Sequence, residues 1–160
     1  MSLENPLWHY ALTLYSRPGV EQCCLQLQDQ GAVVNRLLFA CWLASRGIRL
    51  DRSRLRQADA RWHGEVTQPL RALRFRLRNQ LTALPEASAC YRALGQAELA
   101  AEQVELMLLW QHSQGWVADR KVSAALFRYN LHQAGGECHG QVDPLLLQLQ
   151  SAALELLADE

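Results

Sequence analysis

β-Branched residues are scarce in this chain of 160 residues, and their scarcity argues against a sheet as the main architecture. Valine, isoleucine and threonine contribute only 8, 1 and 3 residues, whereas leucine and alanine contribute 30 and 21. Leucine and alanine favour helices, and β-branched residues favour strands. The composition therefore predicts an all-α fold. The length predicts one domain, residues 1–160, whose core is large enough to be stable without disulfides.

The sequence also has no net charge and no long apolar run. Its 16 basic side chains are balanced by 16 acidic ones, so the overall charge does not predict binding to nucleic acid or to a membrane. No apolar segment approaches the roughly 18 residues needed to cross a bilayer. No basic cluster precedes an apolar run near the N-terminus, as it would in a signal peptide. We expect a soluble, cytoplasmic protein with no membrane partner.

The features of several enzyme classes are missing. The chain has no phosphate-binding glycine-rich loop, no nucleophile elbow and no His-Glu-x-x-His motif. His132, Cys138 and His139 lie close together, but no second ligand pair completes a tetrahedral metal site. The cysteines are odd in number and mostly set among apolar neighbours, which predicts reduced thiols: Cys23, Cys24, Cys41, Cys90 and Cys138. We expect no metal and no cofactor, and catalysis is the less favoured interpretation.

Proline and glycine mark the ends of the predicted helices. Pro6 is placed to begin a first helix, and Gly31 and Gly47 are placed to end the second and third. Residues 32–45 are apolar on nearly every side, which predicts a central, buried helix. Pro69 restarts or kinks the chain. The pattern predicts a compact all-α bundle of seven to nine helices.

Several motifs resemble those of a known family. They are LYSRPGVEQCCLQLQDQGAVVNRLLFACWLASRG (14–47), Trp62, PLRALRFRLR (69–78) and ELAAE (98–102). In this order they resemble a family of small, all-helical bacterial proteins of unknown function. The resemblance covers about the first two-thirds of the chain and implies no catalytic residue. The chain departs from the pattern at Val33, Arg36 and Phe75, where the family pattern has an acidic, an aliphatic and a basic residue.

Two polar residues at the second and third helices have two alternative interpretations. Asn35 shares a helix face with apolar residues, so its amide is predicted to be buried and hydrogen-bonded. Asp29 lies at the end of the preceding helix. In the functional alternative, Asp29 and Asn35 form a ligand pocket with Tyr15 and His9. In the structural alternative, which we favour, they fix the turn at Gly31 and connect adjacent helices.

The middle of the chain is rich in arginine. Residues 46–78 contain ten arginines and three acidic residues, whereas the whole chain has a single lysine, Lys121. On a helix that begins at Pro69, the spacing places three arginines on one face, with an aromatic residue on the same side: Arg71, Arg74, Arg78 and Phe75. Arginine suits planar, bidentate partners such as carboxylate or phosphate. We include Arg56 in the predicted partner-binding surface.

Three alternatives remain open for this arginine-rich face. Glu98, Glu102 and Glu105 could neutralise it within the fold. An anionic macromolecule, either nucleic acid or an acidic protein, could bind it. A small anionic ligand could bind in a pocket between the N-terminal helices and the arginine-rich helix. A non-catalytic binding or adaptor role is the leading functional interpretation, and an enzyme or binder acting on a small anionic ligand is the alternative. The sequence does not predict an oligomeric state.

Overall fold

A single buried helix forms the centre of the fold. The computed structural model describes residues 2–136 and 141–160, and its third helix, α3 (Val34–Ser45), is buried over most of its length. Gly31 ends the preceding turn with a positive φ of 95°, a conformation that glycine adopts readily. Ala32 and Val33 then lead into α3. The predicted central helix at about residues 32–45 is therefore confirmed.

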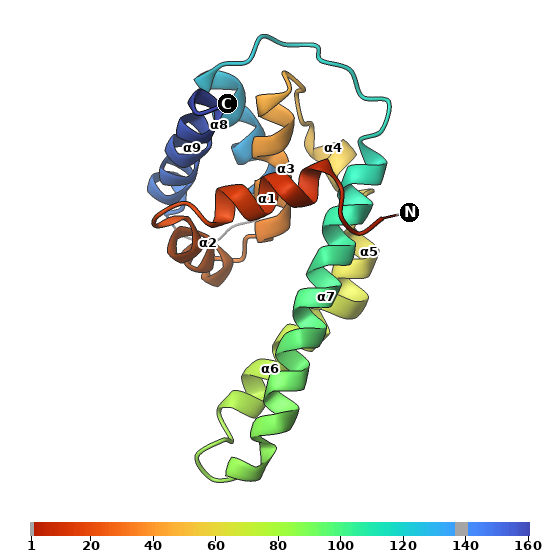
Figure 1. Cartoon of the computed structure of the whole chain (residues 1–160), viewed down its shortest axis with the longest axis vertical. Helices are drawn as coiled ribbons and strands as arrows, with labels where there is room; N and C mark the ends of the chain where they lie inside the picture. The colour runs from red at the N-terminus through yellow and green to blue at the C-terminus, as the bar shows by residue number, and fades with distance from the viewer. Residues whose placement is uncertain (1, 137–140) are drawn as a thin grey trace.

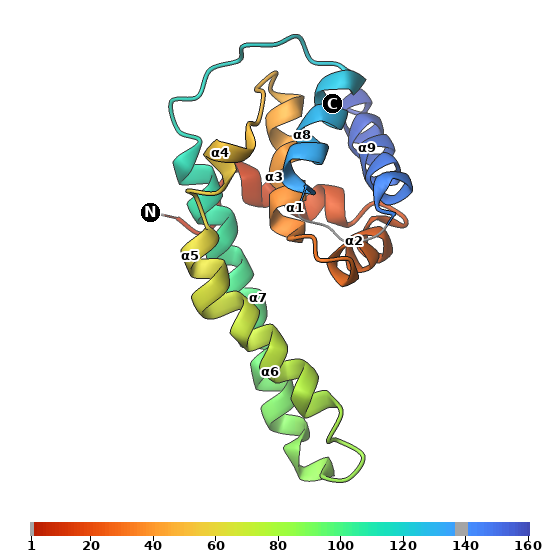
Figure 2. The same cartoon turned by 180° about the vertical axis from the view of Figure 1, so that it is seen from behind.

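Four further helices surround α3 and form the body of the protein. Figures 1 and 2 show α1 (Pro6–Tyr15) crossing α3, with α8 (Ala124–Ala134) beside it. α2 (Val20–Asp29) packs mainly against α9 (Asp143–Ala158). Leucine, alanine and aromatic side chains from all five helices make one continuous apolar core. The body is thus a helical bundle built on α3.

The start of α1 follows the local signals of the sequence. The side chain of Asn5 accepts a hydrogen bond from the main-chain N–H of Trp8, at 3.0 Å. This bond satisfies one of the free N–H groups at the beginning of a helix. Pro6 occupies the first turn, where its missing N–H costs nothing. The N-terminal boundary of α1 is therefore determined by two consecutive positions, Asn5 and Pro6.

An arm made of two antiparallel helical segments extends from the body. One segment runs through α5 (Ala60–Trp62), the π-helix η1 (His63–Thr67) and α6 (Gln68–Arg78). The other is α7 (Ser88–His112), which packs along α6 and whose C-terminal half reaches α1 and α3. Both views show the arm projecting beyond the body (Figures 1 and 2). Two short elements complete the described chain: α4 (Arg52–Leu55) and the 3₁₀ turn η2 (Pro85–Ala87).

The structure confirms the predicted fold class. Residues 2–136 and 141–160 contain the helices α1–α9 and no β-strand, which agrees with an all-α bundle of seven to nine helices. Among these residues, no helix is both long enough and apolar enough to serve as a membrane span. Their four cysteines are free thiols, three buried and one, Cys90, exposed. Cys138 and His139 lie outside the described residues.

Candidate functional site

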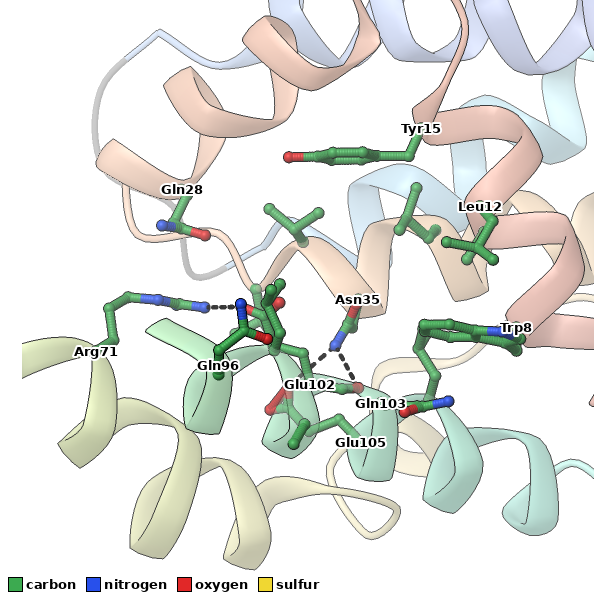
Figure 3. A pocket seen from close by; sticks show the side chains of 17 residues that line it. Trp8, Leu12, Tyr15, Gln28, Asn35, Arg71, Gln96, Glu102, Gln103 and Glu105 are labelled. Carbon is green, nitrogen blue, oxygen red and sulfur yellow. Dashed lines mark hydrogen bonds and ion pairs between the residues drawn. The ribbon is translucent and has the colours of Figure 1, made fainter. Parts of the chain in front are cut away.

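A pocket of about 440 Å³ lies in the angle between the body and the arm. Its walls come from α1, α2 and α3 on the body side and from α6 and α7 on the arm side. Figure 3 shows these side chains converging from separate helices. Its volume falls within the range of small-molecule sites in proteins. The pocket is therefore the feature from which we build the candidate site.

One part of the pocket is apolar. Trp8 and Leu12 line it from α1, and Leu38 lines it from α3. Leu99 and Leu106 line it from α7, and Leu99 is 60% exposed. An apolar group bound here would remove these carbon surfaces from water, which is favourable by about 25 cal/mol for each Å² buried. This part of the pocket therefore favours a hydrocarbon or aromatic group.

The other part of the pocket carries polar side chains. In Figure 3 the hydroxyl of Tyr15 points to the side of the pocket where Gln28 and Arg71 lie. The side chains of Tyr15, Gln28 and Gln96 line the pocket and make no hydrogen bond with any residue in the described ranges. Burial raises the pKa of Tyr15 to about 12, so its hydroxyl remains a donor at neutral pH. These groups can accept or donate hydrogen bonds to a ligand.

Asn35 and Glu105 connect α3 to α7 at the pocket wall. The Asn35 amide donates to Glu105 Oε2 at 3.1 Å and to the main-chain oxygen of Glu102 at 3.0 Å. His63 Nδ1 lies 2.6 Å from Glu105 Oε1. Glu105 is only 1% exposed, so each bond replaces water that the carboxylate lost on burial. Asn35 therefore has a structural role and also lines the pocket.

A second buried carboxylate lies near this cluster. Arg36 Nε donates to both oxygens of Asp59, at 3.1 and 3.2 Å. Burial raises the pKa of Asp59, Arg36 opposes this shift, and the negative charge of Glu105 adds to it. The charge of Arg36 compensates this carboxylate, which is only 1% exposed.

Two of the predicted partner-binding arginines form ion pairs within the arm. Arg71 donates to Glu98 through Nε at 2.9 Å and to Glu102 through Nη2 at 2.8 Å. Arg74 also donates to Glu98, through Nε. Burial alone would raise the pKa of Glu98, but the hydrogen bonds and charges of the two arginines outweigh burial and lower it. Arg71 and Arg74 are therefore neutralised within the fold by glutamates of α7, as in the first of the three alternatives for the arginine-rich face.

The other residues of the predicted partner-binding surface, Arg78, Phe75 and Arg56, are exposed. Arg78 is exposed, and its guanidinium lies 5.1 Å from the centre of the Phe75 ring. The guanidinium of Arg74 lies 5.1 Å from the same ring. Phe75 is 36% exposed. Arg56 follows α4 and is exposed.

The structure brings together some of the predicted pocket residues and separates others. Tyr15 and Asn35 both line the pocket, whereas Asp29 and His9 are exposed side chains outside its lining. His63 could not be predicted from the sequence, because a single histidine with no partner in its own segment gives no local signal. The spacing of Glu98, Glu102 and Glu105 by four and three residues does place them on one helix face. This spacing is the sequence feature that relates Glu105 to the other two glutamates of the site.

Glu102 makes stability depend on pH in a predictable direction. Burial raises its pKa, Arg71 opposes this, and Glu98 and Glu105 add to the rise. A carboxyl group with a higher pKa in the folded chain binds its proton more tightly there than in the unfolded chain. The free energy of unfolding should therefore rise as pH falls through the folded pKa towards the ordinary carboxyl range.

Urea unfolding midpoints measured at successive pH values would test this prediction. The pKa of Asp59 is raised, as is that of Glu102. Glu98 has the opposite effect: its pKa in the folded chain lies below the ordinary value, so the stabilisation that it gives is lost at lower pH. We expect Glu102→Gln to reduce the rise in the free energy of unfolding between neutral pH and the ordinary carboxyl range. A rise of unchanged size in Glu102→Gln would contradict the assignment to Glu102.

The comparisons with known proteins identify a family but no activity. Within the described ranges, no group of three or more histidine, cysteine, aspartate or glutamate side chains is arranged to hold a metal ion. No curated protein and no solved structure matches the chain. A family model described as protein of unknown function (DUF2390) matches residues 6–109, the part of the chain that contains every residue lining the pocket. The chain therefore belongs to this family of proteins of unknown function.

Proposed function

We propose that this chain is a binding protein that takes the apolar part of a ligand into the pocket between body and arm. The observation that carries the proposal is the pocket itself. Apolar side chains of α1, α3 and α7 line one part of it. The other part is lined by hydrogen-bonding side chains that have no partner within the described part of the chain: Tyr15, Gln28 and Gln96. Pockets of this mixed character bind small molecules in many proteins.

The charged groups of the pocket favour binding over catalysis. Arg71 is held by Glu98 and Glu102, and Glu105 accepts hydrogen bonds from Asn35 and interacts with His63. Because other side chains already hold these charged groups, the pocket offers a ligand mainly its neutral polar groups. The free thiols, of which Cys23, Cys24 and Cys41 are buried, are consistent with a reducing, cytoplasmic location, which is part of the proposal.

The same groups indicate that the ligand is uncharged where it lies inside the pocket. Arg71 faces two carboxylates, so its charge is compensated before any ligand arrives. A small anion placed wholly inside would also meet Glu105 and Glu102. The proposal therefore differs from the sequence-based alternative of a small anionic ligand contained in the pocket.

Binding of an uncharged fluorescent probe tests the proposal. We expect N-phenylnaphthylamine to bind the full-length chain saturably, with a rise in fluorescence. Ala100 is exposed on α7 and lines the pocket, so Ala100→Phe should fill part of the space and weaken binding at least about tenfold, the equivalent of one or two lost apolar contacts.

The matched control is Ala97→Phe. Ala97 is also exposed on α7 but does not line the pocket. This variant adds the same phenyl group to the same helix and should leave probe affinity unchanged. Equal weakening by both variants, or no saturable binding to the wild-type chain, would contradict the proposal.

An anionic macromolecular partner is the second candidate. The observation in its favour is the exposed ring of Phe75 between the guanidinium groups of Arg74 and Arg78. An aromatic ring flanked by arginines can stack on a nucleic acid base or enter a pocket of an acidic protein. It has less support than the pocket, because Arg71 and Arg74 already have carboxylate partners.

A further inference from the structure

A second hollow continues the pocket along the arm. Its volume is about 400 Å³, and it is lined by Arg74 of α6 and by five residues of α7. Gln96 and Leu99 line both the pocket and this hollow, so the two spaces adjoin along α7. Gly95 lines the hollow where a larger side chain would narrow it, because a Cβ there would lie 3.7 Å from the side chain of Arg74. A ligand that fills the pocket can therefore extend into the hollow.

The hollow differs from the pocket in charge. Three charged side chains line it: Arg74, Arg92 and Glu98. Arg92 is exposed and has no ion pair with any residue of the described chain, whereas Glu98 is paired with Arg74 and Arg71. The lining of the hollow thus carries one positive charge more than negative charge. The pocket and the hollow together form one path. The unpaired cation Arg92 lies at its arm end, and the apolar side chains of the pocket lie at its other end.

We propose that the ligand of this path is a long-chain carboxylate. Its hydrocarbon chain lies against Trp8, Leu12 and Leu38 in the pocket, and its carboxylate lies in the hollow at Arg92. This inference rests on the proposed function, because it names the ligand class of the same pocket. A single unpaired arginine matches the one negative charge of a carboxylate, and its planar fork can donate two parallel hydrogen bonds.

The dimensions of the arm agree with such a ligand. Gln103 lines the pocket near Trp8, and Arg92 lies eleven residues earlier on the same helix, a distance of about 16 Å along the axis. An extended apolar chain with a terminal carboxylate can span this distance. A phosphate monoester carries a charge of about −1.5 to −2 at neutral pH, which exceeds the single positive charge in excess here.

Tryptophan quenching by a bromine-labelled fatty acid tests the proposal. Bromoundecanoate carries bromine at the end opposite its carboxylate, and bromine quenches only a tryptophan that it contacts. We expect saturable quenching of the full-length chain that disappears in Trp8→Phe. Arg92→Glu should weaken binding roughly tenfold, because a favourable charge contact is replaced by repulsion at a partly exposed site.

The control variant is Arg76→Glu. Arg76 is also an exposed arginine of the arm, and it lines neither the pocket nor the hollow. It changes the net charge of the chain by the same amount as Arg92→Glu and should leave the affinity for bromoundecanoate unchanged. The amine of the same length should bind more weakly than the carboxylate to the wild-type chain and more tightly than the carboxylate to Arg92→Glu.

Two results would overturn the proposal. One is equal affinity of the wild-type chain for the carboxylate and the amine, and the other is equal weakening by Arg92→Glu and Arg76→Glu. Uncharged N-phenylnaphthylamine separates this failure from a failure of the proposed function. If its binding remains sensitive to Ala100→Phe, the pocket binds ligands and only the assignment of the carboxylate is wrong. If its binding is also absent, both proposals fail.

Discussion

Replacing Arg71 and Arg74 together by methionine is expected to lower the free energy of unfolding by about 3 kcal/mol. The side chain of Glu98 is only 7% exposed, and these two arginines supply its ion pairs. Without them, a charged carboxylate would remain between two helices with neither water nor a cation to compensate it. Methionine retains most of the apolar stem of arginine, so the loss reports on charge more than on packing. Urea denaturation at neutral pH would measure it.

Controls for this prediction separate an internal role from a partner-binding role. Arg78 is exposed and has no carboxylate partner among the described residues, so Arg78→Met should change stability by less than about 0.5 kcal/mol. Adding Glu98→Gln to the double variant should recover part of the loss, because it removes the unpaired charge. If the double variant keeps its stability but loses a bound nucleic acid or acidic protein, the arginines belong to a partner surface instead.

Local sequence signals were sufficient to predict the body of the fold. Pro6, Gly31 and Gly47 mark helix boundaries through backbone conformation, which depends on neighbouring residues and not on the tertiary structure. The run of apolar residues in α3 predicts burial in any orientation of the surrounding helices. Composition and the positions of proline and glycine therefore predict the helices, and the apolar run predicts the central position of α3.

The arm could not be predicted in the same way. In the structure, α7 runs as a single helix from Ser88 to His112. Gly95 lies within it, at a cost of about 0.5 to 1 kcal/mol relative to alanine. Packing of α7 against α6 along the arm offsets that cost. Such long-range packing has no local signal.

The candidate site was predicted in part for the same reason. Tyr15 and Asn35 stand out as polar residues on largely apolar helix faces, and both line the pocket. Asp29 and His9 were grouped with them by proximity in sequence, but their helix positions turn them to solvent. The contact of Glu105 with His63 joins residues 42 positions apart, and nothing in either segment specifies it.

Asn35→Leu is expected to destabilise the fold by about 1.5 to 3 kcal/mol, the typical cost of removing a hydrogen bond to a buried charged group. The Asn35 amide is the donor to Glu105 Oε2, and leucine of similar size cannot donate. Asp29→Asn should change stability by less than about 0.5 kcal/mol, because Asp29 is exposed at the end of α2. Thermal or urea unfolding of the two variants gives the comparison directly.

A third variant identifies the cause of the loss. In the Asn35→Leu background, Glu105→Gln replaces the unpaired carboxylate by a neutral amide, so it should restore part of the stability that Asn35→Leu removes. The interaction energy of this double-mutant cycle measures the bond between α3 and α7, because both residues lie on that interface. No recovery would mean that leucine disturbs the packing of the pocket wall. A stable Asn35→Leu variant that no longer binds N-phenylnaphthylamine would instead assign Asn35 to ligand binding alone.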